Sequence, residues 1–255
     1  MSKILRVENL YKSFGGIDAT KNVSFHVVPK EILGILGPNG AGKTTVFNQI
    51  SGFLKPDKGA IFFKDKNIVG IKPHVLANMG IARTFQLVRP FHGMSLEENL
   101  QIPFMSPRGK EVLKKALNEG RTQKQLMEEI LVSLGLENNL SLSVDKLPHG
   151  ALKKLELAKV SAIEPEIIML DEPFGGLTTK EIDSLSDYIL DLNQKRGITF
   201  IIIEHRLREF MKLVQRVVVL NYGEKITEGT PQEVVENPLV IEAYLGKGGA
   251  KVAST

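Results

Sequence analysis

The chain has 255 residues, of which 42% are hydrophobic and 24% are charged, with a net charge of +4. This composition is that of a globular protein and excludes the disordered, collagen-like and coiled-coil classes. The chain contains no cysteine, which excludes disulfides, thiolate metal sites and cysteine nucleophiles. At about 150 residues per domain, the length predicts one large domain or a core with an inserted lobe.

The chain begins with short strands. Apolar and polar side chains alternate within residues 1–30 and again at 61–63, as they do in half-buried strands. No signal-peptide core is present, and no apolar run approaches the ~18 residues that span a bilayer. We therefore expect a soluble protein whose membrane role, if any, comes through a partner.

A second pattern predicts the core. Residues 31–36, 166–170 and 198–203 form short, β-branched, almost unbroken apolar runs, which are typical of strands buried on both faces. Amphipathic helices are predicted between them, at residues 44–51 and 180–195. This alternation indicates an α/β fold with a mostly parallel sheet.

The alternation stops in the middle of the chain, where residues 95–134 have helical spacing. The residues expected on apolar helix faces are Leu113, Leu117, Leu126, Ile130 and Leu134. We predict a helical lobe inserted between two strands of the sheet. The expected organisation is a core of residues 1–86 and 161–246, a helical lobe at 87–160 and a flexible tail at 247–255.

Residues 37–44 read GPNGAGKT, which matches G-x-x-x-x-G-K-S/T between a predicted strand and a predicted helix. The glycines let backbone N–H groups turn toward anionic oxygens, and the helix adds its positive end. Lys43 is predicted to neutralise nucleotide phosphates and the Thr44 hydroxyl to ligate Mg²⁺. The predicted nucleotide-binding residues are Gly37, Pro38, Asn39, Gly40, Ala41, Gly42, Lys43, Thr44 and Thr45.

Two adjacent acids, Asp171 and Glu172, follow the apolar run at 166–170. An acid at a strand end can hold Mg²⁺, and its neighbour can accept a proton from an attacking water. Taken alone, two adjacent acids at a strand end are as readily explained as solvated surface charges as they are by a catalytic role. Because a phosphate loop precedes them, we interpret Asp171 as a metal ligand and Glu172 as a general base.

Several motifs together resemble the ATPase subunits of ATP-binding cassette (ABC) transporters in order and spacing. They are Phe14, the phosphate loop, Gln86, residues 147–151, Asp171-Glu172-Pro173 and His205. The resemblance covers residues 3–246. It implies a P-loop NTPase with a mostly parallel core sheet, an N-terminal antiparallel β subdomain and an inserted helical lobe.

The resemblance also implies roles for three further side chains. Phe14 is expected to stack on adenine, although any base can stack on a phenyl face. Gln86 is expected to contact Mg²⁺ and the attacking water, and to couple the nucleotide state to the helical lobe. His205 is expected to contact the γ-phosphate and to orient Glu172.

The family's L-S-G-G-Q segment is altered here to LPHGA at residues 147–151. Pro148 has neither a hydroxyl nor a backbone N–H, so it cannot replace the hydrogen bond of the family's serine. Gly150 is retained, and a helix predicted over 151–162 can offer its N-terminus to a γ-phosphate across a dimer. We therefore expect a weak half-site in which Gly150 acts in trans. Thr178 and Glu181 are predicted to form a capping box for the next helix.

Two stretches, residues 80–100 and 219–246, resemble the ATPases of branched-chain amino acid importers. The implied function is ATP hydrolysis in a head-to-tail dimer, with ATP and Mg²⁺ as cofactors, at the cytoplasmic face of a membrane. The implied partners are membrane permease subunits, a second identical or paralogous ATPase and, indirectly, a solute-binding protein; no nucleic acid is expected.

Other functions remain open. The cargo could instead be urea, short amides or lipopolysaccharide. Alternatives of another class are a soluble ABC-type protein acting on nucleic acid or iron–sulfur assembly, and a regulatory switch with little turnover. The expected docking patch for a membrane subunit is Leu87, Val88, Arg89, Pro90, Phe91, Met94 and Leu100, unless Phe91 and Met94 fill the core of the lobe.

Overall fold

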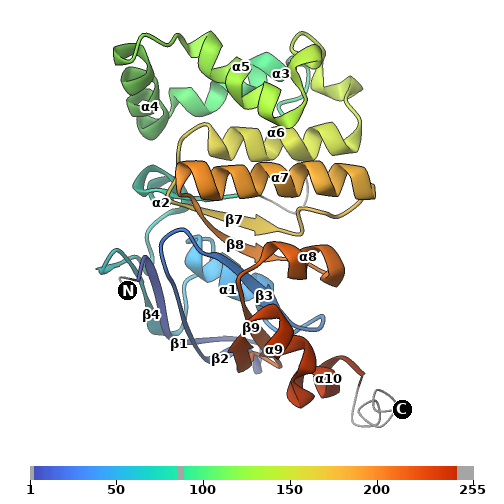
Figure 1. Ribbon diagram of the computed structural model, residues 1–255. Coiled ribbons are helices and arrows are strands. Elements are labelled where there is room, and N and C mark those ends of the chain that lie inside the picture. The colour runs from blue at the N-terminus through green and yellow to red at the C-terminus, as the bar shows by residue number, and fades with distance from the viewer. Residues whose placement is uncertain (1–2, 85–88, 246–255) are drawn as a thin grey trace. The chain divides into compact units, whose positions relative to one another are not determined.

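The structure is a computed structural model that describes residues 3–84 and 89–245. The chain divides into two compact units, residues 1–76 with 199–255 and residues 77–198 (Figure 1). Gln86, Leu87 and Val88 lie outside the described residues. Among those described, no helix has the length and apolar character needed to cross a membrane.

The first unit contains an antiparallel sheet and a parallel group of strands. Its strands are β1 (Leu5–Phe14), β2 (Ile17–Val27), β3 (Ile32–Leu36), β4 (Lys58–Phe63), β5 (Lys66–Asn67), β8 (Thr199–Ile203), β9 (Arg216–Asn221) and β10 (Glu224–Gly229). Its helices are α1 (Lys43–Ile50), α8 (Leu207–Leu213), α9 (Pro231–Glu236) and α10 (Pro238–Leu245). Helix α2 (Pro73–Met79) begins in this unit and ends in the second.

The antiparallel sheet has the order β2-β1-β4-β5. Leu5 pairs with Val27 on one side and with Phe63 on the other, and all three side chains are buried. The alternation of apolar and polar residues therefore places one face of the sheet in the core. The N-terminal antiparallel subdomain is confirmed.

The parallel group is built around β3, which lies between β8 and β9. All five residues of β3 are buried, because the strand is covered on both faces. Strand β10 adds an antiparallel edge to β9. Ile35 pairs with Ile203, so the segments that follow β3 and β8 leave the sheet at the same edge.

The second unit combines two parallel strands with a set of helices. Its strands are β6 (Ile81–Arg83) and β7 (Ile167–Asp171), and its α-helices are α3 (Leu96–Gln101), α4 (Pro107–Asn118), α5 (Gln123–Leu134), α6 (His149–Ser161) and α7 (Thr179–Arg196). Short 3₁₀ turns are at Ile102–Met105, Glu137–Asn139 and Val144–Lys146. Helix α5 packs against α6 (Figure 1) and also contacts α7. The predicted lobe at 87–160 lies inside this unit, together with β6, β7 and α7.

The start of α7 forms as predicted. The Thr178 side chain accepts a hydrogen bond from the Glu181 N–H, and the Glu181 carboxylate accepts one from the Thr178 N–H. This reciprocal pair satisfies two backbone donors that a helix start otherwise leaves unpaired. The segment between β7 and α7 is thereby fixed at its far end.

The apolar face of α4 differs from the expected one. Leu117 is 56% exposed, and the buried side of the helix carries Val112 and Ala116. Both spacings fit a helical period, but residues 112 and 116 lie one position before the predicted 113 and 117. The helix was predicted correctly and its orientation was not.

Candidate functional site

The phosphate-loop motif connects β3 to α1 and requires glycine at two enclosed positions. Gly37 has φ 154°, and a Cβ there would lie 2.2 Å from the Leu220 carbonyl oxygen. Gly42 has φ 96°, and its Cβ would lie 2.3 Å from the Ala19 carbonyl oxygen. At these two positions, neighbouring backbone carbonyls therefore leave no room for a side chain.

Lys43 lies within the loop that precedes it. Its side chain is buried, and its ammonium donates to the carbonyl oxygens of Gly37 at 2.6 Å and Pro38 at 2.9 Å. Its charge is therefore held close to the loop backbone, where an anionic oxygen is expected to bind.

The N-terminus of α1 completes the anion-binding features. Gly42 is the N-cap and provides no side-chain cap to the N–H groups of the first turn. Such groups are suited to bind phosphate oxygens. Thr44 is exposed at this end and Thr45 is half-buried, so the Thr44 hydroxyl is the more accessible metal ligand. The loop, the lysine and the helix N-terminus together are suited to bind the phosphates of a nucleoside triphosphate.

Tyr244 contacts the phosphate loop, which sequence reasoning did not predict. The Gly37 N–H donates to the Tyr244 hydroxyl at 3.1 Å, across a separation of 207 residues. Burial raises the pKa of this hydroxyl, and the hydrogen bond from Gly37 opposes that rise. Gly37 is thus held on both sides, by Tyr244 at its N–H and by Lys43 at its carbonyl. Helix α10 thereby contacts the first residue of the phosphate-loop motif.

Replacing Tyr244 with phenylalanine is expected to weaken ATP binding by roughly 5-fold, because one hydrogen bond contributes about 1 kcal/mol. The ring remains to fill the same space, so the change removes only the hydroxyl. Equilibrium titration with ATP–Mg²⁺ measures the effect.

Tyr188→Phe is the matched control, because it removes a buried hydroxyl that bonds to Ser161 in the other unit. If Tyr244→Phe lowers the melting temperature as Tyr188→Phe does but leaves ATP affinity unchanged, the Tyr244 contact is only structural.

Phe14 and His205 also belong to the first unit. Phe14 ends β1 with its side chain half-exposed and the Lys12 ammonium 5.5 Å from its ring centre, which excludes a core role. His205 follows β8 and is exposed. The buried Glu204 carboxylate accepts hydrogen bonds from the N–H groups of His205, at 2.6 Å, and Arg206. The backbone of His205 is therefore fixed at the end of β8.

Asp171 is the last residue of β7 in the second unit, and it is only 4% exposed. Its Oδ2 accepts a hydrogen bond from Arg83 Nη2 at 2.7 Å, and both side chains of this ion pair are buried. A buried carboxylate needs such a partner. Sequence reasoning missed Arg83, although it lies within residues 80–100, which resemble the importer ATPases.

Glu172 has an unusual backbone conformation for a residue with a side chain. Its φ is 51°, in the left-handed region that residues other than glycine seldom adopt. Its carbonyl oxygen accepts hydrogen bonds from the Gly175 N–H at 3.2 Å and from the Lys153 ammonium at 3.2 Å. The half-buried carboxylate follows directly after Asp171, as expected for a base beside a metal ligand.

The altered segment at 147–151 leads into α6. Pro148 is the N-cap and makes no side-chain capping bond to the first turn. A Cβ on Gly150 would lie 1.9 Å from a Glu181 carboxylate oxygen. Hydrogen bonds from the Thr178 backbone and hydroxyl hold that carboxylate and lower the pKa of Glu181. A side chain at residue 150 would therefore have to displace the Glu181 carboxylate, and the role of Gly150 toward a second subunit's nucleotide stays a prediction.

The predicted site residues are shared between the two units. Phe14, residues 37–45 and His205 belong to the first; Gly150, Asp171 and Glu172 belong to the second. In the described part of the chain, no group of three or more His, Asp or Glu side chains is arranged to hold a metal ion.

Two family models match the sequence. The model described as "ABC transporter" matches residues 20–175. The model described as "Branched-chain amino acid ATP-binding cassette transporter" matches residues 224–250.

Curated relatives match almost from end to end. The high-affinity branched-chain amino acid transport ATP-binding protein LivG of Escherichia coli is 37% identical, over 96% of this chain and 98% of its own. BraF of Pseudomonas aeruginosa, which has the same description, is also 37% identical, with the same coverage.

Solved structures share the fold. A nucleotide-free ATP-binding cassette from an ABC transporter is 33% identical, with a TM-score of 0.84 over 96% of this chain and 100% of its own. A cassette solved in its ADP conformation has the same identity and TM-score, over 97% of this chain and 100% of its own.

Proposed function

Because the chain belongs to the ABC family of transporter ATPases and hydrolyses ATP, we propose that it powers the import of branched-chain amino acids through membrane permease subunits. The assignment of the cargo rests on the family match at residues 224–250, together with similarity to LivG and BraF over nearly the whole chain. The protein is proposed to act at the cytoplasmic face of the membrane, where the permease subunits bind it.

The proposed chemistry divides between binding and proton transfer. Phe14 stacks on the adenine base, residues 37–45 surround the phosphates, and Lys43 neutralises their charge. Thr44, Asp171 and Gln86 would hold Mg²⁺, which would supply positive charge to neutralise the phosphates. Glu172 accepts a proton from the attacking water, which His205 helps to orient. The bonded Lys43 ammonium and the fixed backbones of Glu172 and His205 support these assignments.

The working form is a head-to-tail dimer of this ATPase with an identical or paralogous copy. Gly150 and the N-terminus of α6 contact the nucleotide bound by the other copy. We expect this contact to be weak, because Pro148 offers the nucleotide neither a hydroxyl nor an N–H. The isolated chain is therefore expected to dimerise poorly, and permease subunits hold the two copies together.

Phe91 is the proposed anchor for the permease. Its ring is 47% exposed and lies 5.1 Å from the Lys159 ammonium, which excludes the alternative that it fills the core. Buried Asn99 fixes its backbone, accepting from the Phe91 N–H at 2.8 Å and donating to the Phe91 carbonyl at 3.1 Å. Leu100, expected in the same patch, is instead fully buried.

Replacing Phe91 with aspartate is expected to abolish co-purification with the permease subunits and ATP-driven leucine uptake into vesicles. An aromatic anchor commonly contributes ~2 kcal/mol, or about 30-fold in affinity. The fold should persist, because Asn99 bonds only the backbone and an aspartate can pair with Lys159. Basal ATP hydrolysis is expected to be unchanged.

Val132→Asp, at another exposed apolar residue of the same unit, is the matched control and should leave uptake intact. Normal assembly of a folded Phe91→Asp protein would place the docking surface elsewhere. Uptake of urea by the unaltered complex, in place of leucine, isoleucine or valine, would reject the proposed cargo.

A further inference from the structure

We infer that Lys153 is a positioning residue for the base, because its ammonium holds the backbone of Glu172 and links it to α6. This inference deepens the proposed function and rests on the assignment of Glu172 as the base. Lys153 lies on α6, 19 residues before Glu172, and its ammonium donates to the Glu172 carbonyl at 3.2 Å.

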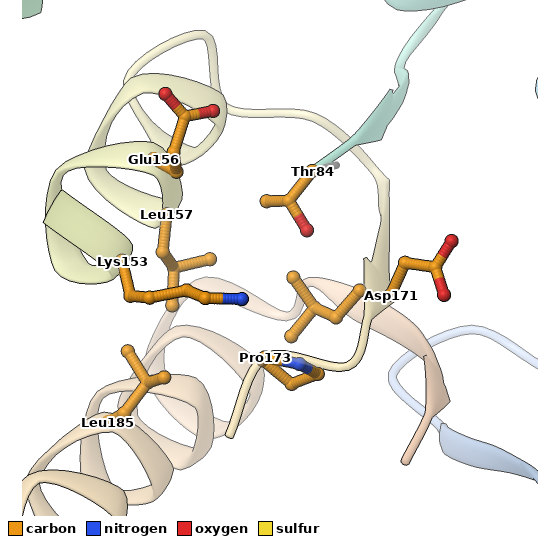
Figure 2. Close-up of a pocket in the computed structure, with 8 residues that line it drawn as sticks. Thr84, Lys153, Glu156, Leu157, Asp171, Pro173 and Leu185 are labelled. Atoms are coloured by element: carbon orange, nitrogen blue, oxygen red, sulfur yellow. The ribbon is translucent and has the colours of Figure 1, made fainter. Parts of the chain in front are cut away.

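The position of the Lys153 side chain supports a specific role. The residue is only 8% exposed, although a lysine ammonium normally stays in water. In Figure 2 it extends from α6 toward the segment between Asp171 and Pro173. The surrounding pocket, lined by Thr84, Leu157 and Leu185 among others, holds about 10 Å³, close to the space of one water molecule. Solvent therefore competes little for the bond to Glu172.

The carboxylate of Glu156 lies on the same helix but is engaged elsewhere. It accepts a hydrogen bond from the Lys159 ammonium at 2.8 Å, and in Figure 2 it points away from the Lys153 ammonium. Lys153 and Glu156 are both buried, yet they point in different directions. The lysine is thus directed at the strand end rather than at its nearest acid on α6.

The conformation of Glu172 explains why such a bond matters. A left-handed φ of 51° is unfavourable for a glutamate and persists only where surrounding contacts hold it. The Glu172 carbonyl belongs to the peptide unit that follows Cα, so holding this oxygen restricts rotation of the backbone from which the side chain leaves. The Gly175 N–H bonds the same oxygen from within the loop, whereas Lys153 bonds it from another element.

This bond also gives α6 a second role. The helix begins at His149, directly after Pro148, and Lys153 lies about one turn beyond Gly150. A displacement at the start of α6, where the second copy's nucleotide is proposed to bind, would move the ammonium that holds Glu172. Lys153 thereby connects occupancy of one nucleotide site in the dimer with the orientation of the base at the other.

The test compares three variants of the full-length chain in steady-state ATP hydrolysis. Lys153→Met keeps the length of the side chain but cannot donate, and kcat is expected to fall about 10- to 100-fold, as for other misplaced catalytic groups. KM for ATP should stay within about 2-fold, because the phosphate loop is untouched. Lys153→Arg, which retains a donor, should recover most of the lost kcat.

Lys154→Met is the matched control. This neighbouring lysine also donates to a backbone carbonyl, that of Leu134 at 2.8 Å, and its loss should leave kcat near the unaltered value. Equal losses of kcat and melting temperature in Lys153→Met and Lys154→Met would overturn the inference, since both changes would then act through the stability of α6.

A double variant separates this inference from the assignment of the base. In a Glu172→Gln background, Lys153→Met should cause no further loss, because its effect passes through the glutamate. If the double variant loses as much additional kcat as Lys153→Met loses alone, the positioning role is overturned. It is also overturned if Glu172→Gln stalls hydrolysis but Lys153→Met hydrolyses ATP at the normal rate. If Glu172→Gln itself turns over normally, the assignment of the base fails, whatever Lys153 does.

Discussion

Replacing Lys43 with alanine is expected to abolish measurable ATP binding. The buried ammonium, held by the carbonyls of Gly37 and Pro38, is proposed to neutralise the phosphates. A hydrogen bond to a charged group contributes about 1.5–3 kcal/mol, so the loss of two such bonds to phosphate oxygens weakens binding by roughly 100-fold or more. Isothermal titration with ATP–Mg²⁺ is the measurement.

Lys55→Ala removes the same charge at an exposed position in the same unit and should bind ATP normally. A folded Lys43→Ala protein with unchanged ATP affinity would reject the assignment of residues 37–44 as the phosphate loop. Loss of binding in both variants would indicate a general electrostatic effect and not a specific contact.

Replacing Glu172 with glutamine is expected to preserve ATP binding while slowing hydrolysis by about 10²- to 10⁴-fold, which is the usual contribution of a general base. The amide keeps the size of the side chain and leaves the backbone bonds from Lys153 and Gly175 in place. It cannot accept the proton of the attacking water. Phosphate release measures the rate, and sedimentation with ATP–Mg²⁺ measures any dimer that accumulates.

Glu137→Gln makes the same chemical change at an exposed position of the same unit and should hydrolyse ATP at the normal rate. Near-normal turnover by Glu172→Gln would show that another group accepts the proton. Loss of ATP binding in this variant would instead show that the carboxylate acts in binding.

Features that depend on neighbouring residues could be predicted from the sequence. The phosphate loop is a contiguous motif, and the cap of α7 involves only Thr178 and Glu181, so both could be identified without tertiary information. Strand β3 could be predicted because burial on both faces leaves an unbroken apolar run.

Contacts between distant segments could not be predicted in this way. Arg83 and Asp171 are 88 residues apart, and Gly37 and Tyr244 are 207 residues apart. Nothing in either local pattern identifies its partner, since an arginine in a strand and a tyrosine in a terminal helix have many possible partners. The close approach of the Glu181 carboxylate to Gly150 was hidden for the same reason.

The bond between Gly37 and Tyr244 constrains how this protein can change over evolution. The loop motif is shared across a very broad family, whereas the C-terminal segment matches a narrower one. A hybrid that takes residues 224–245 from a relative with no hydroxyl at position 244 would keep its motif intact and still lose the partner of the Gly37 N–H. Such a hybrid is expected to bind ATP more weakly than the parent chain, as Tyr244→Phe is, and a tyrosine restored at position 244 should recover the affinity.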